Sequence, residues 1–140
     1  MIVSLFFYIF MMLRMEEDYL YKDETYKVIG ACIEVHNKPG QGLLEAVYQK
    51  ALETELSSRD IPFKSKVKLD VYYDEVKLNK IYVADMICYD TIIIEIKATS
   101  FLIQDHFKQL LNYLKATNYK LGLLVNFGGR SLKVKRIINS

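Results

Sequence analysis

The sequence predicts an α/β sandwich in which helices pack on a mixed β-sheet. Three observations predict this class: two helical periodicities come first, three strand-like segments follow, and a further helix and strand complete the order. The 140 residues are 51% hydrophobic, with only six glycines and two prolines. This composition can bury one domain core, and it excludes disordered and low-complexity proteins.

Two helices joined by a turn are expected to open the domain. Apolar residues recur at intervals of three and four through residues 28–35 and again through residues 43–56. The first pattern stops at residues 37–40, which contain a Pro-Gly pair, and the second stops at residues 57–62.

Three strands are expected next, because residues 67–73 alternate between apolar and polar and residues 78–88 and 91–98 are rich in apolar residues. Residues 102–114 carry the apolar face of a helix, with Ser100 as its predicted N-cap. Residues 121–127 are apolar on both faces, as expected of an interior strand. Residues 131–138 then predict a basic edge strand.

The N-terminal 13 residues are uncharged and almost wholly apolar. They are shorter than the roughly 20 residues that span a bilayer, and they have neither a basic leader nor a small-residue cleavage site. A membrane partner is therefore disfavoured, and membrane association through residues 1–13 is kept as a third interpretation that depends on this segment being translated. Our hypothesis is that residues 1–14 are an upstream extension from a misassigned start codon and that residues 15–140 form a single domain. The alternative is a hydrophobic arm that packs on this domain or on a second copy.

The cysteines and the charge distribution limit the classes of function and the compartment that are expected. Cys32 and Cys88 lie in apolar runs, which predicts buried free thiols rather than zinc or a disulfide and fits a reducing, cytoplasmic compartment. The net charge of +2 divides into +6 from Thr99 onward and −4 before it. The basic part could contact a polyanion, or it could be a solvated tail.

Two charged residues interrupt the most apolar strand. Glu95 and Lys97 share one face of residues 91–98, and a lone buried charge is costly, so the pair must be solvated, compensated or bound to an ion. Glu-x-Lys by itself is weak evidence, because Glu75 and Lys77 repeat it in a predicted turn.

The register of the preceding hairpin decides whether Asp85 reaches Glu95. A two-residue loop would pair Cys88 with Thr91 and place Asp85 on the wrong face. A three-residue loop would pair Cys88 with Ile92 and place Asp85 directly across from Glu95. We predict the second register.

Adjacent carboxylates of this kind favour a hard divalent cation. Mg²⁺ binds carboxylate oxygens, keeps several waters and bridges to phosphate. It can acidify a bound water, while a lysine such as Lys97 orients the hydroxide and offsets the phosphate charge. Asp85, Glu95 and Lys97 therefore form a coherent candidate site for phosphodiester hydrolysis.

The order Asp85, Glu95-x-Lys97 resembles the signature of the PD-(D/E)XK nuclease superfamily, with alanine rather than proline before the aspartate. The stretch Gly42-Leu-Leu-Glu45-Ala-Val-Tyr48 resembles the GxxExxY pattern that names a group of small proteins in that superfamily. Gln109 and Tyr113 are spaced as in RecB-like nucleases. The resemblance covers residues 26–139.

The resemblance implies a restriction-endonuclease-like core of order α-α-β-β-β-α-β, with a possible extra C-terminal strand. It implies Mg²⁺ or Mn²⁺ held by Asp85, Glu95, the Ile96 carbonyl and Glu45, with Lys97 as the catalytic lysine. Gln109 is assigned to the catalytic set. His36 and His106 are interpreted as structural.

The predicted function is therefore a metal-dependent nuclease, with DNA favoured over RNA as its substrate. The alternative is a non-catalytic nuclease fold that binds nucleic acid or a partner protein. A homodimer is plausible, because one small domain offers a limited footprint on a duplex. The residues expected to contact nucleic acid are Lys108, Tyr113, Lys115, Arg130, Lys133, Lys135 and Arg136.

Overall fold

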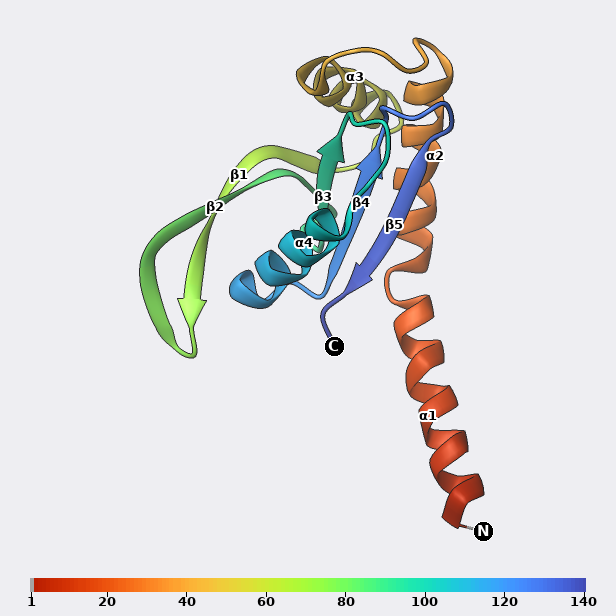
Figure 1. Ribbon diagram of the computed structural model, residues 1–140, viewed down its shortest axis with the longest axis vertical. Coiled ribbons are helices and arrows are strands. Elements are labelled where there is room, and N and C mark those ends of the chain that lie inside the picture. Colours follow the sequence, from red (N-terminus) through yellow and green to blue (C-terminus); the bar gives the residue numbers. More distant parts are fainter. Residues whose placement is uncertain (1) are drawn as a thin grey trace.

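The computed structural model describes the backbone of residues 2–140 and the side chains of residues 4–16 and 20–140. The chain forms four helices and five strands within this part (Figure 1). They are α1 (Ile2–Tyr19), α2 (Lys22–Asn37), α3 (Glu45–Ser58), β1 (Phe63–Tyr73), β2 (Val76–Cys88), β3 (Ile92–Lys97), α4 (Gln104–Thr117), β4 (Leu121–Asn126) and β5 (Lys133–Ile138).

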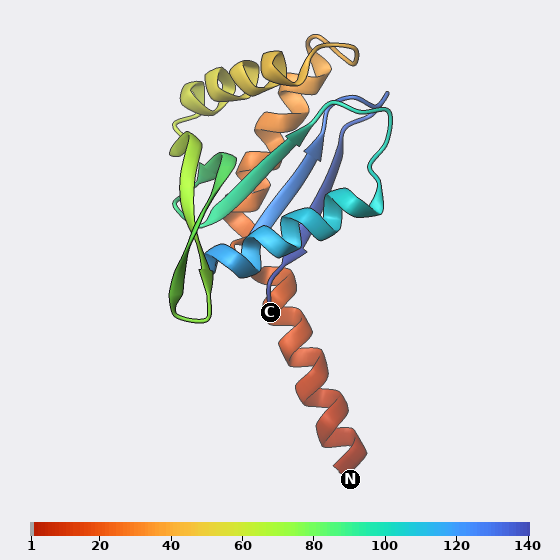
Figure 2. The same cartoon turned by 60° about the vertical axis from the view of Figure 1, so that its left-hand side comes forward.

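The strands of the described chain form one mixed sheet in the order β1-β2-β3-β4-β5. Only the central pair β3 and β4 is parallel, and the other neighbours are antiparallel. Helices α2 and α3 cover one face and α4 lies on the other (Figure 2). The predicted α/β class, the interior position of β4 and the basic edge strand β5 are confirmed.

Alternation along β3 divides the core between the two faces. Ile92, Ile94 and Ile96 pack with the α2 and α3 side chains, whereas Ile93 packs with Leu110 of α4. Because successive side chains of a strand point to opposite faces, Glu95 and Lys97 belong to the α4 face. The sheet therefore presents both charged residues on the side opposite to α2.

The first turn of α4 begins later than the sequence predicts. Ser100 is not the N-cap; α4 follows Ile103, whose backbone N–H donates to His106 Nδ1 at 3.2 Å. The reason lies in the loop before the helix, because the Asn126 side chain exchanges two 3.0 Å hydrogen bonds with the Thr99 backbone. These bonds hold the preceding segment as a loop and give His106 a capping role.

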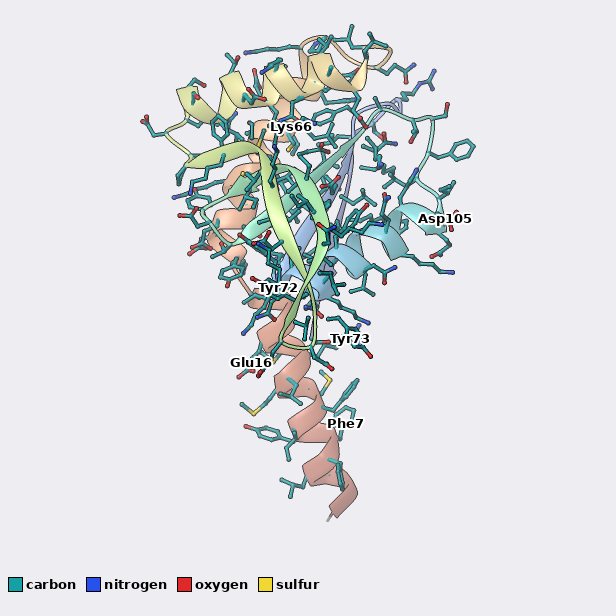
Figure 3. The ribbon with its side chains drawn as sticks, turned by 90° about the vertical axis from the view of Figure 1, so that its left-hand side faces the viewer. Phe7, Glu16, Lys66, Tyr72, Tyr73 and Asp105 are labelled. Carbon is teal, nitrogen blue, oxygen red and sulfur yellow. The ribbon has the colours of Figure 1, made fainter. Side chains whose placement is uncertain are left out.

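Helix α1 continues past Met15, so the predicted boundary between an extension and the domain falls within a helix. The helix projects away from the sheet, and its apolar side chains, such as Phe7, are exposed (Figures 1 and 3). Across the residues that the structure describes, no helix combines the length and the apolar character needed to cross a membrane.

The β1–β2 hairpin changes face along its length. Near its base, Phe63 and Met86 pack in the α2 and α3 core. Further along, Val67 and Ala84 pack in the core on the α4 side. The hairpin therefore bends between these two levels, and the bend brings its outer part over the α4 face (Figure 1).

Lys66 and Asp85 lie at this bend, between the ladder pairs Ser65–Met86 and Val67–Ala84. Lys66 has a φ of 50°, in the left-handed region that a lysine rarely adopts. Such conformations are retained where the surrounding structure over-determines them, often at functional sites.

Candidate functional site

The β2–β3 register is the one predicted from a three-residue loop. Cys88 pairs with Ile92, and the ladder continues through Met86 and Ile94. Tyr89 in the connection has a φ of 55°, as tight reversals require. Continuing this register by one residue places Asp85 across from Glu95.

Side-chain hydrogen bonds replace the ladder at that next position. The Asp85 N–H donates to Glu95 Oε1 at 3.3 Å, and the Ile96 N–H donates to Asp85 Oδ2 at 2.8 Å. In an extended strand the N–H and C=O of one residue face the same neighbour, so the Ile96 carbonyl also faces β2. Two carboxylates and one carbonyl thus lie around one gap between the strands.

Glu95 is half-buried, and the hydroxyl of Tyr82 donates a hydrogen bond to its Oε1. Burial, followed by the negative charge of Asp85, raises the pKa of Glu95 to about 7. Burial and the Glu95 charge also raise the pKa of Tyr82, which keeps its hydroxyl protonated. Carboxylates pressed together in this way favour a bound positive charge.

Lys66 supplies a positive charge to the gap. Its Nζ lies 2.8 Å from Asp85 Oδ1, and Figure 3 shows Lys66 at the bend of β1 beneath α3. The hydrogen bond to Asp85 raises the pKa of Lys66 despite partial burial, with further contributions from the charges of Glu45 and Glu95. Lys66 therefore acts as the counter-ion of the carboxylate pair.

Helix α3 holds β2 at this position through Gln49. The Gln49 side chain is buried, and its Nε2 donates to the Asp85 carbonyl at 3.0 Å and to Glu53 Oε2 at 3.1 Å. Glu45 lies one helical turn before Gln49, on the same side of α3, and is exposed. Its charge reaches Lys66, which places Glu45 at the rim of the candidate site.

Lys97 is the last residue of β3 and is half-buried. Its carbonyl accepts a 2.8 Å hydrogen bond from the N–H of Phe127. Its ammonium forms no hydrogen bond or ion pair with any other residue in the described part of the chain. The ammonium is therefore available to a ligand on the face that it shares with Glu95.

Helix α4 contacts the site through Tyr113, which stacks on Tyr82 of β2. Gln109 Nε2 donates to the Tyr113 hydroxyl at 3.3 Å. The Tyr113 ring stacks on Tyr82, with ring centroids 3.7 Å apart and planes inclined by 16°. Since Tyr82 bonds Glu95, the predicted pair Gln109 and Tyr113 is connected to the carboxylate of β3.

The donor set suits a divalent cation with several waters. The chemistry is that of Asp85, Glu95 and the Ile96 carbonyl, which are the oxygen ligands that Mg²⁺ and Mn²⁺ prefer. Within the described chain, no three His, Cys, Asp or Glu side chains lie close enough together to bind one metal ion. Glu45 is therefore not a third direct ligand beside Asp85 and Glu95. The Lys66 ammonium already places a cation against Asp85, and the residues therefore fit a metal ion.

The basic residues expected to contact nucleic acid lie in three places. Lys108 and Lys115 are exposed on α4. Arg130, Lys133 and Lys135 line a cavity beside the loop that follows β3. The Arg136 guanidinium is directed instead toward the start of α2, where it donates to the Leu20 carbonyl just before the helix and to Thr25 Oγ1 in its first turn.

The two histidines interpreted as structural have structural contacts. His36 is buried and its Nε2 donates to the Gly129 carbonyl at 3.0 Å, which ties the end of α2 to the β4–β5 loop. His106 accepts the N–H of Ile103 at the start of α4. Cys32 and Cys88 are both buried and free, as predicted.

Three contacts of the site were not foreseen from the sequence. Lys66 follows the same polar alternation as other lysines of its strand and carries no distinguishing signal. Gln49 could have been found, because Glu45, Gln49 and Glu53 are polar residues spaced four apart and therefore lie on one side of the helix. Tyr82 lies three residues before Asp85, and its role depends on the bend.

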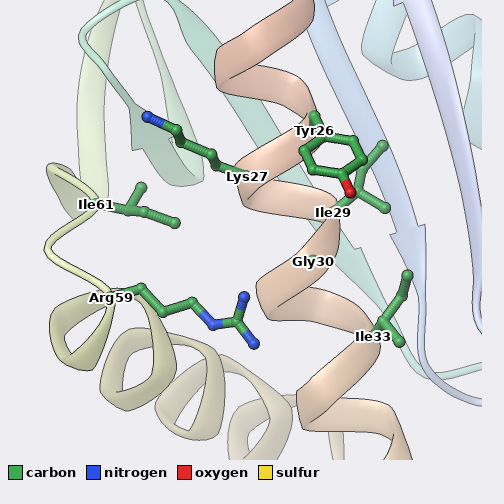
Figure 4. A pocket seen from close by; sticks show the side chains of 7 residues that line it. All are labelled: Tyr26, Lys27, Ile29, Gly30, Ile33, Arg59 and Ile61. Carbon is green, nitrogen blue, oxygen red and sulfur yellow. The ribbon is translucent and has the colours of Figure 1, made fainter.

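A cavity of about 440 Å³ lies away from this site, between α2 and the segment after α3 (Figure 4). It combines apolar side chains such as Ile29 and Ile33 with the basic residues Lys27 and Arg59. No carboxylate is among its lining residues in the described chain, so the Asp85–Glu95 pair remains the candidate for chemistry.

Comparisons with known proteins agree with this fold. No match was found among curated proteins. A solved structure titled "Crystal structure of SSO0001" is similar, with a TM-score of 0.53 and 23% sequence identity over 67% of this chain and 49% of that chain. The match spans about half of that longer chain and supports the fold alone. A family model described as the PD-(D/E)XK nuclease superfamily matches residues 22–137, and the chain therefore belongs to that superfamily.

Proposed function

We propose that this protein is a metal-dependent nuclease that hydrolyses phosphodiester bonds, with DNA as its substrate. The observation that carries the proposal is the gap where the β2–β3 ladder stops. There Asp85, Glu95 and the Ile96 carbonyl face one another, and Lys97 follows on the same strand. Membership of the superfamily supports nuclease activity in general.

Each side chain has a proposed role. Asp85, Glu95 and the Ile96 carbonyl would hold Mg²⁺ or Mn²⁺, with Glu45 reaching the ion through water. When bound, the ion lowers the pKa of a water and stabilises charge on the phosphate. Lys97 orients the attacking water and offsets phosphate charge, because its ammonium has no competing partner in the described chain.

The α4 residues position rather than react. Gln109 and Tyr113 form one hydrogen-bonded unit that stacks on Tyr82, and Tyr82 in turn fixes Glu95. We propose that Gln109 also contacts the scissile phosphate from its exposed position. These features, with Glu45 at the rim of the site, support placing the chain in the GxxExxY group and the RecB-like branch.

The remaining proposals concern the setting of the activity. The exposed basic residues of α4 and β5 would contact the phosphate backbone without reading sequence. Buried free cysteines support a cytoplasmic location, and the small footprint supports a homodimer on duplex DNA. We retain the hypothesis that residues 1–14 extend a domain formed by residues 15–140.

A cleavage assay with Asp85→Asn tests the proposal. Wild type should cut supercoiled or single-stranded DNA when Mn²⁺ is supplied, and the variant should not. Asp70→Asn is the matched control, because Asp70 is also on the hairpin but pairs with Lys77 away from the gap. Parallel RNA substrates report the preferred nucleic acid. Cleavage retained by Asp85→Asn would refute the proposed site, and binding without cleavage by wild type would favour a non-catalytic module.

A further inference from the structure

A second feature lies at the same end of the sheet as Lys97. An open cavity of about 350 Å³ is lined by the loop after β3, the start of α4, the β4–β5 loop and β5. We infer that this cavity binds an unpaired base of a single-stranded DNA segment, which makes single-stranded or frayed DNA the preferred substrate. The inference rests on the proposed nuclease function.

Two phenylalanine rings line the cavity. Phe101 is 74% exposed on the loop after β3, and Phe107 of α4 is half-buried in the same cavity. The exposed Phe101 ring is open to contact with a ligand, and aromatic rings are stacking partners for unpaired bases. Stacking of this kind tolerates any base, because every base has a π-face.

The charged residues that line the cavity are all basic. Arg130, Lys133 and Lys135 surround the rings, and no acidic side chain is among the described residues that line the cavity. The two lysines lie two positions apart on β5 and therefore point to the same face of the sheet. A row of cations beside an exposed aromatic ring matches a nucleic-acid strand, whose phosphates alternate with its bases.

The cavity is also built on a rigid support. The Gly128 N–H and the Thr99 N–H both donate to Asn126 Oδ1 at 3.0 Å, so one buried side chain fixes the two loops together. A Cβ at Gly128 would lie only 2.3 Å from the Thr99 backbone, so only glycine allows this approach. The loops that present Phe101 are therefore locked before any ligand arrives.

Position along the chain connects the cavity to the proposed chemistry. Phe101 follows Lys97 by four residues, which limits their Cα separation to about 14 Å. Figure 2 shows the connecting loop leaving the upper end of β3 beside the β4–β5 loop. Lys133 and Lys135 lie on the α4 face, the face that also carries Glu95 and Lys97. One DNA strand can therefore reach both places.

A duplex would not satisfy this cavity, because its bases are paired and stacked inside the helix. An unpaired base can stack on Phe101 without first breaking a base pair. The geometry accordingly favours single strands, overhangs or frayed ends over intact duplex.

The test measures binding in EDTA, so that it does not depend on cleavage. Fluorescence anisotropy would compare a labelled single strand with the same sequence as a duplex, for wild type, Phe101→Ala and Tyr73→Ala. Tyr73 is the matched control, being an aromatic residue that is 70% exposed at the far end of the hairpin. We expect wild type to prefer the single strand and Phe101→Ala to bind it about tenfold more weakly, with Tyr73→Ala unchanged.

Two further readouts separate the possible failures. A 2-aminopurine base in the strand should be quenched by wild type and not by Phe101→Ala, which shows stacking directly. Lys133→Ala should instead reduce the slope of log affinity against log salt by about 0.7, the value for one phosphate contact on a single strand. Equal single-strand binding by wild type and Phe101→Ala, or preference for duplex, would overturn this inference. If Phe101 proves not to contribute to binding, the cleavage test of Asp85→Asn is unaffected. The two proposals can therefore fail independently.

Discussion

The two sides of β3 are bonded very differently. Toward β4 the parallel ladder is unbroken from Ile92 to Lys97. Toward β2 it ends at Ile94, and the carboxylates of Asp85 and Glu95 take over the hydrogen bonding. The β4 side therefore contributes stability, whereas the β2 side gives up regular pairing to gather polar atoms in one gap. The candidate site is therefore created by an interruption of the sheet.

The substitution that should cost the most stability lies on the β4 side of β3. Leu123→Ala on β4 removes a fully buried side chain from the core and should lower the free energy of unfolding by about 3–5 kcal/mol. Urea denaturation measures the loss. Metal-dependent cleavage per folded molecule should remain near that of wild type. A loss of activity as complete as that of Asp85→Asn would contradict the division in which the β4 side contributes stability and the β2 side contributes the site.

The next effect is a gain of stability on the interrupted side. In the metal-free fold the pKa of Glu95 is about 7, above its ordinary value of 4.5, so stability provided by its protonated form is lost as the pH rises from about 4.5 to about 7. Glu95→Gln removes this loss and should stabilise the protein at pH 8 by about 3 kcal/mol in EDTA, while abolishing cleavage.

Thermal denaturation between pH 4 and pH 8 measures this difference. The gain should be absent at pH 4 and reach its full value above pH 7. If the variant is less stable than wild type at pH 8, then burial and the charge of Asp85 do not disfavour the ionised form of Glu95.

A smaller effect concerns the link from α3. Gln49→Met keeps the size of the buried side chain but leaves the Asp85 carbonyl without its donor. We expect a loss of about 1–2 kcal/mol in unfolding free energy, together with weaker Mn²⁺ binding, because β2 is no longer held at the gap. Lys50→Met is the control on the exposed side of the same helix. Equal Mn²⁺ affinity in Gln49→Met and wild type would show that α3 does not position the site.

The smallest effect on stability belongs to the counter-ion. Lys66→Met leaves the carboxylate pair uncompensated, and because the Lys66 side chain is 60% exposed the metal-free protein should lose only about 1 kcal/mol. Mn²⁺ should bind several-fold more tightly, since no ammonium has to be displaced from Asp85. Calorimetry with Lys68→Met as control measures this, and weaker binding by Lys66→Met would show that the ammonium assists the metal.

The regular side of the molecule follows directly from the sequence. Period-two alternation predicts the faces of β3, because alternation and burial are local properties that one sequence contains. The length of the β2–β3 loop is not determined in this way: the sequence allows a loop of two or three residues, and the structure has the three-residue register that we predict, which places Asp85 across from Glu95.

The interrupted side does not follow from the sequence, because it depends on tertiary contacts. Lys64, Lys66 and Lys68 are equivalent in an alternating pattern, and only the left-handed bend directs Lys66 to Asp85. Ser100 is a favourable N-cap residue by its chemistry, yet Asn126, 26 positions later, holds the preceding Thr99 in a loop. Such long-range constraints override local preference.

Mn²⁺ titration calorimetry of wild type and Glu95→Gln at pH 8 tests the proposed metal site most directly. Wild type should bind Mn²⁺, and the variant, although folded and more stable, should not. Equal binding by both proteins, or no binding by wild type, would contradict the claim that the interruption between β2 and β3 is a metal site.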